Sequence, residues 1–143
     1  MKADRIDHIS IFVKDLNKAI NLFSGVLGVE FPEPWDSKDF DIRETVGPVP
    51  LCLDLCSPLT PDGASAKLIE HKGEGVSMIS FKVPDLDEAV AEMESRGVRQ
   101  LTRLKRGNVE TATFHPKDTF GVMIELIQYT EKHPLITAFG EQS

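Results

Sequence analysis

A repeated segment organises the sequence of this chain of 143 residues. Residues 6–29 read IDHISIFVKDLNKAINLFSGVLGV, and residues 76–98 read VSMISFKVPDLDEAVAEMESRGV. Each copy begins with an alternating apolar stretch, which indicates a strand, and then continues through Asp-Leu into apolar residues at helical spacing. Asp15 and Asp85 suit the first positions of these helices, and a glycine suits the end of each. The duplication predicts two halves with the same fold.

Three strands are predicted after each helix. In the first half they are VEF, DFDIRETV and VPLCLDLC, and in the second half they are VRQLTRL, VETATFHP and GVMIELIQ. Each half therefore reads βαβββ, and the predicted fold class is α+β, with two such modules related by a pseudo-twofold axis. We expect one domain over residues 1–143, made of modules at 5–59 and 75–130, a linker at 60–74 and a tail at 131–143. The tail is a candidate for a short docking helix.

The charge of the chain narrows the classes of partner. A formal net charge of −7 comes from 16 basic and 23 acidic side chains, and no basic face is clustered, so nucleic acid is not expected as a partner. No apolar run reaches the length of a membrane span, and residues 1–8 lack the apolar core of a signal peptide, so we expect a cytoplasmic protein.

The two cysteines are not expected to form a disulfide. Cys52 and Cys56 point to the same side of one predicted strand, too far apart for a disulfide, and are expected to be buried free thiols.

Polar side chains interrupt the predicted strands at positions that the repeat relates. Asp54 lies in LCLDL and Glu125 lies in VMIEL, 71 residues apart, close to the offset of 70 between His8 and Met78. A carboxylate in the middle of an apolar strand is costly unless it is paired, hydrogen-bonded or bound to a metal. Taken singly, His8 is more often a core histidine, and either carboxylate is more often part of a buried ion pair, with Arg43 or Lys82 for example.

Taken together, one histidine and two carboxylates on the polar faces of related strands are better explained by a shared site. Oxygen ligands with one imidazole suit a divalent ion such as Mn, Co, Zn, Fe or Mg. The same polar faces carry Ser10, Ser80 and Lys82.

These residues resemble the vicinal oxygen chelate superfamily, which includes glyoxalases, bleomycin-resistance proteins and extradiol dioxygenases. Within it the chain is most similar to methylmalonyl-CoA epimerases. The resemblance extends from RIDHISIFVKDL to the closing ELIQ, and its more specific parts are AKLIEHKGEGV and FHPKDTFGVMIEL. It implies a curved mixed sheet around a central cleft and, by analogy, a homodimer.

The resemblance also implies a metal site and a base. His8, Asp54 and Glu125 match metal-ligand positions, and Met78 stands where the family has a second histidine, because this chain reads SMI in place of HHI. A thioether is a weak ligand for hard ions, so either the other three residues hold the metal, or the metal is gone and Met78 fills the floor of an apolar pocket. Glu44, in DIRETV, matches the proton-transferring glutamate of the family.

The function implied is that of a metal-assisted isomerase, an epimerase-like enzyme that moves a proton next to a thioester or similar carbonyl of a small molecule such as an acyl-CoA. The metal would stabilise an enolate as a Lewis acid. Glu44 and Glu125 are the candidate catalytic residues. The candidate substrate-binding residues are Met78, Ser80, Lys82 and His115.

Several alternatives stay open. Lys82 is also explained as a lysine that extends to the rim of the fold, His115 as a turn residue before the last strand, and Glu44 as an exposed partner of Arg43. The enzyme could instead be a diverged lyase, a decarboxylase or a glyoxalase-like isomerase, since Met78 departs from the family pattern. A non-catalytic binding protein of the resistance type is a further alternative, although such a protein has little need for two buried carboxylates.

Overall fold

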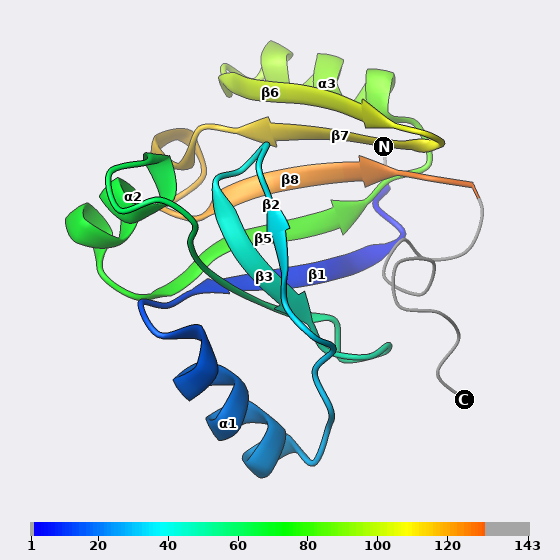
Figure 1. The fold of residues 1–143 in the computed structure, drawn as a ribbon. Helices are drawn as coiled ribbons and strands as arrows, with labels where there is room; N and C mark the ends of the chain where they lie inside the picture. The colour runs from blue at the N-terminus through cyan, green and yellow to red at the C-terminus, as the bar shows by residue number, and fades with distance from the viewer. Residues whose placement is uncertain (1, 131–143) are drawn as a thin grey trace. The chain divides into compact units, whose positions relative to one another are not determined.

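The computed structural model describes residues 2–130, so the tail at 131–143 lies outside the described residues. The chain divides into two compact units, which we describe separately. Unit 1 contains the described residues 2–9 and 77–130, and unit 2 contains residues 10–76. The first strand, β1 (Arg5–Phe12), contributes its beginning to unit 1 and its end to unit 2 (Figure 1).

Unit 2 holds the first helix and three antiparallel strands. Its elements are α1 (Leu16–Leu27), β2 (Trp35–Ser37), β3 (Ile42–Val46), β4 (Leu53–Pro58) and α2 (Ala64–Lys72). β3 pairs with both β2 and β4. The Asp15 carboxylate accepts the backbone N–H of Lys18 and so caps α1, which ends at Gly28 in the left-handed conformation, with φ 67°. Leu16 and Ala19 of α1 pack on Leu55 of β4 to form the buried core.

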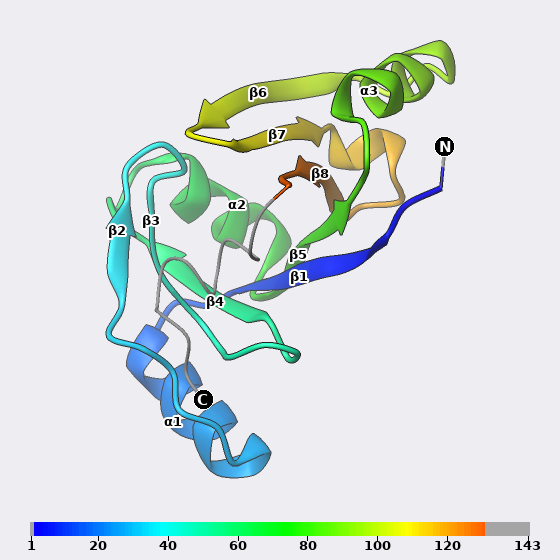
Figure 2. The ribbon, with the colours of Figure 1, turned by 90° about the vertical axis from the view of Figure 1, so that its right-hand side faces the viewer.

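Unit 1 repeats the order of one helix followed by three strands, and its helix and strands are labelled in Figure 2. Its elements are β5 (Gly75–Lys82, from Ser77 on), α3 (Leu86–Ser95), β6 (Gln100–Arg106), β7 (Val109–Phe114) and β8 (Met123–Gln128). β5 runs parallel to β8, and β7 is antiparallel to both β8 and β6. Leu86 and Val90 of α3 pack against Phe114 of β7 and Leu126 of β8 in the core.

The α+β class and the strand–helix–three-strand order predicted for each half are confirmed. The two cysteines are free and buried, as predicted. Among residues 2–130, no helix combines the length and apolar character that crossing a membrane would require.

Two strand predictions in the first half are wrong in position. VEF, at 29–31, is irregular, and the strand comes later, at Trp35–Ser37. VPLCLDLC begins as a turn, so that β4 starts only at Leu53. Both shifts have the same cause, because FPEPW and GPVPL each contain two prolines, which lack the N–H that a strand ladder needs.

Candidate functional site

In unit 1, His8 lies between two carboxylates. Its Nδ1 is 2.8 Å from Asp7 Oδ1, and its Nε2 is 3.6 Å from Glu125 Oε1. The imidazole side chain is 14% exposed, and both carboxylate groups are buried. β1 and β8, which supply these residues, are far apart in sequence, and the fold of unit 1 brings His8 and Glu125 together.

Glu125 is held by a neighbouring strand. The Ser80 hydroxyl on β5 donates a hydrogen bond to Glu125 Oε1 over 2.7 Å, and the two residues are register partners in the parallel β5–β8 pair. Ser80 is completely buried and Glu125 is nearly so. The hydrogen bond offsets part of the cost of burying this carboxylate.

Met78 precedes this pair on the same face of the sheet. It is the register partner of Met123 on β8, so two thioether side chains lie beside each other one step before Ser80 and Glu125. At the position where the repeat leads one to expect an imidazole, unit 1 therefore carries a pair of apolar, polarisable thioether side chains.

In unit 2, Asp54 has the same kind of support. The Ser10 hydroxyl donates to Asp54 Oδ2 over 2.8 Å, and both residues are buried. Asp54 Oδ1 is also buried, and it has no hydrogen-bond partner among residues 2–130. An acceptor oxygen left in this way is costly unless a ligand, an ion or a water molecule meets it.

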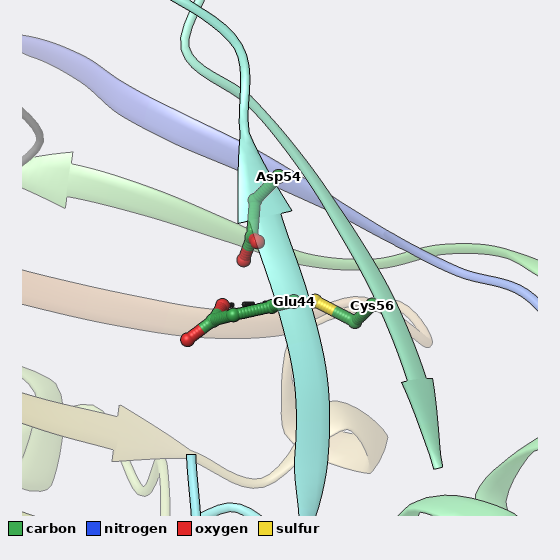
Figure 3. A group of neighbouring side chains, drawn as sticks. All are labelled: Glu44, Asp54 and Cys56. Carbon is green, nitrogen blue, oxygen red and sulfur yellow. Dashed lines mark hydrogen bonds between the residues drawn. The ribbon is translucent and has the colours of Figure 1, made fainter. Parts of the chain in front are cut away.

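Glu44 and Cys56 complete the cluster around Asp54 (Figure 3). They are register partners on β3 and β4, and the Cys56 thiol donates to Glu44 Oε2 over 3.9 Å. Burial raises the pKa of the Cys56 thiol well above its usual range, and the carboxylates of Asp54 and Glu44 act in the same direction. The thiol is therefore a neutral donor toward Glu44 at ordinary pH.

This cluster fits a divalent cation. The potential ligand atoms of Glu44, Asp54 and Cys56 all lie within 4.8 Å of one another, and Asp54 contributes a buried oxygen without a partner in the described part of the chain. Carboxylate oxygens suit the first-row divalent metals, and the Cys56 sulfur would be a ligand only as the thiolate, after loss of its proton.

Lys82 and His115, two of the predicted substrate contacts, have structural partners. Lys82 Nζ donates to Asp4 Oδ2 over 2.8 Å and lies 5.0 Å from the centre of the Tyr129 ring. His115 Nδ1 accepts the backbone N–H of Lys117 and so caps the 3-10 turn Pro116–Asp118. These contacts explain both residues without a substrate, and their role in binding stays a prediction.

Three residues of these clusters were not among the predicted site residues. Asp7 is adjacent to His8, and strand alternation assigns it to the opposite face, so only its contact with Nδ1 reveals its role. Tyr129 follows the last strand and donates to Asp7 Oδ2. Cys56 is predicted from the sequence only as a buried free thiol. Its position two residues after Asp54 is the signal that both side chains lie on one face of the strand.

Comparison with known proteins gives a consistent result. Residues 5–126 match the model of the Glyoxalase/Bleomycin resistance protein/Dioxygenase superfamily. The mitochondrial methylmalonyl-CoA epimerase of Homo sapiens is 26% identical over 129 residues, which are 87% of this chain and 73% of that protein.

Two solved structures extend this comparison. The Streptomyces coelicolor methylmalonyl-CoA epimerase in complex with 2-nitronate-propionyl-CoA has a TM-score of 0.79 and 29% identity, and the match covers 90% of this chain and 96% of that one. Methylmalonyl-CoA epimerase from Mycobacterium tuberculosis has a TM-score of 0.78 and 31% identity, with 91% of each chain covered. The similarity thus extends over nearly the whole of each chain.

Proposed function

The chain belongs to the Glyoxalase/Bleomycin resistance protein/Dioxygenase superfamily, and we propose that within it the chain is an epimerase-like isomerase. The reaction proposed is the removal and return of a proton at the carbon next to the thioester of an acyl-CoA. Relatives named as methylmalonyl-CoA epimerases support the reaction class. The structural observation that supports it most directly is the buried Asp54 Oδ1 beside Glu44, which has no hydrogen-bond partner among residues 2–130.

The resemblance implies His8, Asp54 and Glu125 as ligands of a divalent ion, and we propose each of them as a metal-binding candidate within its own unit, His8 and Glu125 in unit 1 and Asp54 in unit 2. A bound ion would supply positive charge that stabilises the negative charge developing on the thioester oxygen. Asp54 suits this role because one of its oxygens lacks a partner among residues 2–130, while Ser10 holds the other. His8 suits it because Nδ1 is engaged with Asp7, which leaves Nε2 on the side of Glu125.

Glu44 is the proposed base. Its carboxylate accepts the proton from the carbon, and the electron pair of the broken C–H bond moves toward the thioester oxygen. Return of a proton to the opposite face by a second acid inverts the carbon. Cys56 supports the role of Glu44, because its thiol donates a hydrogen bond to one carboxylate oxygen and so helps to hold the carboxylate in place.

An acyl-CoA is the proposed substrate because a solved relative holds 2-nitronate-propionyl-CoA. The basic residues available near β6 are engaged with acidic ones: Arg103 donates to Asp87 and Glu110, and Lys105 lies 3.6 Å from Glu110. Lys117 is the better candidate for a CoA phosphate, because among residues 2–130 its backbone N–H has a partner and its ammonium group has none. A homodimer is proposed by analogy with the family alone.

The test is proton exchange in heavy water. Methylmalonyl-CoA incubated with the protein and divalent metal should acquire deuterium at the carbon next to the thioester. Glu44→Gln should slow this exchange by roughly 10²–10⁴-fold, the usual contribution of a general base. Asp36→Asn is the matched control, because Asp36 lies on the neighbouring strand in an exposed pair with Arg43. Unchanged exchange in Glu44→Gln would remove Glu44 from the mechanism.

The second candidate is a lyase or decarboxylase of the same fold, which the presence of Met78 favours. An apolar Met78–Met123 pair changes the surroundings of Glu125 relative to the family pattern. The same incubation separates the two, because decarboxylation yields propionyl-CoA and CO₂ in place of deuterated methylmalonyl-CoA. Binding of the thioester with neither product would indicate a non-catalytic binding protein.

A further inference from the structure

We propose that Asp7 and Tyr129 are positioning residues for His8, which fix its imidazole as the tautomer with the hydrogen on Nδ1 and the lone pair on Nε2. The assignment of the tautomer depends only on contacts within unit 1. Its importance for metal binding rests on the proposed function, in which His8 is a ligand.

Asp7 is the centre of this arrangement. It is 2% exposed, and its two oxygens accept from two directions: Oδ1 lies 2.8 Å from His8 Nδ1, and Oδ2 lies 2.6 Å from Tyr129 Oη. A carboxylate has only acceptor sites when it is ionised, so the nitrogen that faces it must carry a hydrogen. The contact therefore selects one of the two neutral tautomers of His8.

Tyr129 holds Asp7 in the orientation that this contact needs. Burial raises the pKa of Tyr129 above its usual value, and the hydrogen bond to Asp7 acts in the same direction, so the phenol keeps its hydrogen and donates it. Arg5 Nη2 donates to the Tyr129 oxygen over 2.5 Å. The chain of donors thus runs from Arg5 through Tyr129 to Asp7.

The Tyr129 ring is also fixed from its faces. Lys82 Nζ lies 5.0 Å and Arg5 Cζ lies 5.9 Å from the ring centre, within the range of cation–π contact. Lys82 is held in turn by Asp4. These contacts give Lys82 a place in the support of His8, three contacts away from the imidazole.

The consequence appears at the other side of the imidazole. Nε2 lies 3.6 Å from Glu125 Oε1, which is beyond hydrogen-bond distance, and Ser80 donates to that same oxygen, so this contact does not require a hydrogen on Nε2. A lone pair on Nε2 can bind a metal ion or accept a proton there, whereas the other tautomer would present a hydrogen. Partners of this kind, which hold the second nitrogen of a ligating histidine, typically change metal affinity by about 10–100-fold when they are lost.

The first measurement is the tautomer of His8 by ¹⁵N NMR of the histidine side chains, recorded about two pH units above the ordinary histidine pKa of roughly 6.5. The chain has 4 histidines, and a His8→Gln variant identifies the signal. We expect the Nδ1–H form to dominate in the unmodified protein. In Asp7→Asn, an NH2 group replaces one of the two oxygens, so either His8 or Tyr129 faces a donor in place of an acceptor, and we expect a mixture of tautomers.

Two further variants separate positioning from packing. Tyr129→Phe keeps the ring and its cation–π contacts but removes the donor to Asp7, so the tautomer ratio should lie between those of the unmodified protein and Asp7→Asn. Asp36→Asn, which changes the exposed partner of Arg43 in unit 2, should leave the ratio unchanged. A dominant Nε2–H form in the unmodified protein, or an unchanged ratio in Asp7→Asn, would overturn the proposal.

The second measurement is Co²⁺ affinity by calorimetry. Asp7→Asn should bind Co²⁺ roughly 10–100-fold more weakly than the unmodified protein. Equal affinity together with a changed tautomer ratio would overturn the link to metal binding. Absence of Co²⁺ binding by the unmodified protein would count against the metal in the proposed function, and the NMR result would still decide the positioning role.

Discussion

Ser10 donates a hydrogen bond to Asp54 over 2.8 Å, with both residues buried in unit 2. The same relationship recurs between Ser80 and Glu125 in unit 1, at 2.7 Å. In each case a serine on the first strand of a half holds a carboxylate on the last strand of that half. The duplication has therefore preserved a polar contact inside each core, although the histidine of the first copy has become Met78 in the second.

These serines should contribute measurably to stability. Ser10→Ala or Ser80→Ala removes a hydrogen bond to a buried carboxylate, so each should lower the free energy of unfolding by about 1–3 kcal/mol, measured by urea denaturation. Ser77→Ala is the matched control, because the Ser77 hydroxyl is buried without a hydrogen-bond partner among residues 2–130. That variant should be neutral or slightly stabilising. An equal loss in all three variants would show that volume, and not hydrogen bonding, matters.

Both thiols should be unreactive in the native protein. Cys52 is 6% exposed and Cys56 is completely buried, and burial keeps the pKa of Cys56 high, so little thiolate forms there. With Ellman's reagent near neutral pH we expect no rapid reaction, followed by release of two equivalents when urea unfolds the chain. Rapid native labelling of Cys56, located by mass spectrometry, would show that this side of the cluster opens to solvent.

The Arg99–Asp118 ion pair should make a contribution to folding stability that is lost at acid pH. Arg99 donates to Asp118 from its side chain over 2.8 and 3.1 Å and from its backbone over 3.0 Å. These hydrogen bonds lower the pKa of Asp118 to about 2. Because the pKa is lower in the folded state, the pair stabilises the fold above the ordinary aspartate range, and this contribution is lost as the pH falls toward 2.

An NMR titration of the Asp118 carboxyl carbon measures this effect. Arg99→Ala should return the pKa of Asp118 toward the ordinary value near 3.9. Arg43→Ala, which breaks the exposed pair with Asp36, should leave Asp118 unchanged. A pKa for Asp118 that does not respond to Arg99→Ala would mean that another group holds the carboxylate.

The core of unit 2 should depend strongly on one leucine. Leu55 is completely buried against Leu16 and Ala19, so Leu55→Ala should cost about 2–5 kcal/mol of unfolding free energy. Leu51, in the preceding turn, is 42% exposed, and Leu51→Ala should stay within about 0.5 kcal/mol. Chemical denaturation of the two variants provides the comparison, and similar losses would contradict the assignment of the core.

The errors of sequence-based prediction fall in particular places. The helices were found because apolar periodicity, Asp15 and Asp85 all indicated the same starts. VEF was predicted as a strand from its apolar character, but the two prolines that follow it direct the chain into an irregular segment. Strand alternation does not predict a role for Asp7, because it assigns Asp7 and His8 to opposite faces of β1. In the structure the His8 imidazole nevertheless contacts the Asp7 carboxylate through Nδ1.

By itself the sequence determined the duplication, the α+β class, the order of elements in each half and the polar positions that interrupt the strands. These features are local or periodic along the chain, so they can be predicted without knowledge of the tertiary contacts. The tertiary structure alone decided which polar groups meet: Asp7 with His8 and Tyr129, and Cys56 with Glu44. Such contacts depend on strand register and side-chain direction between distant segments, and the pattern along a single strand does not encode them.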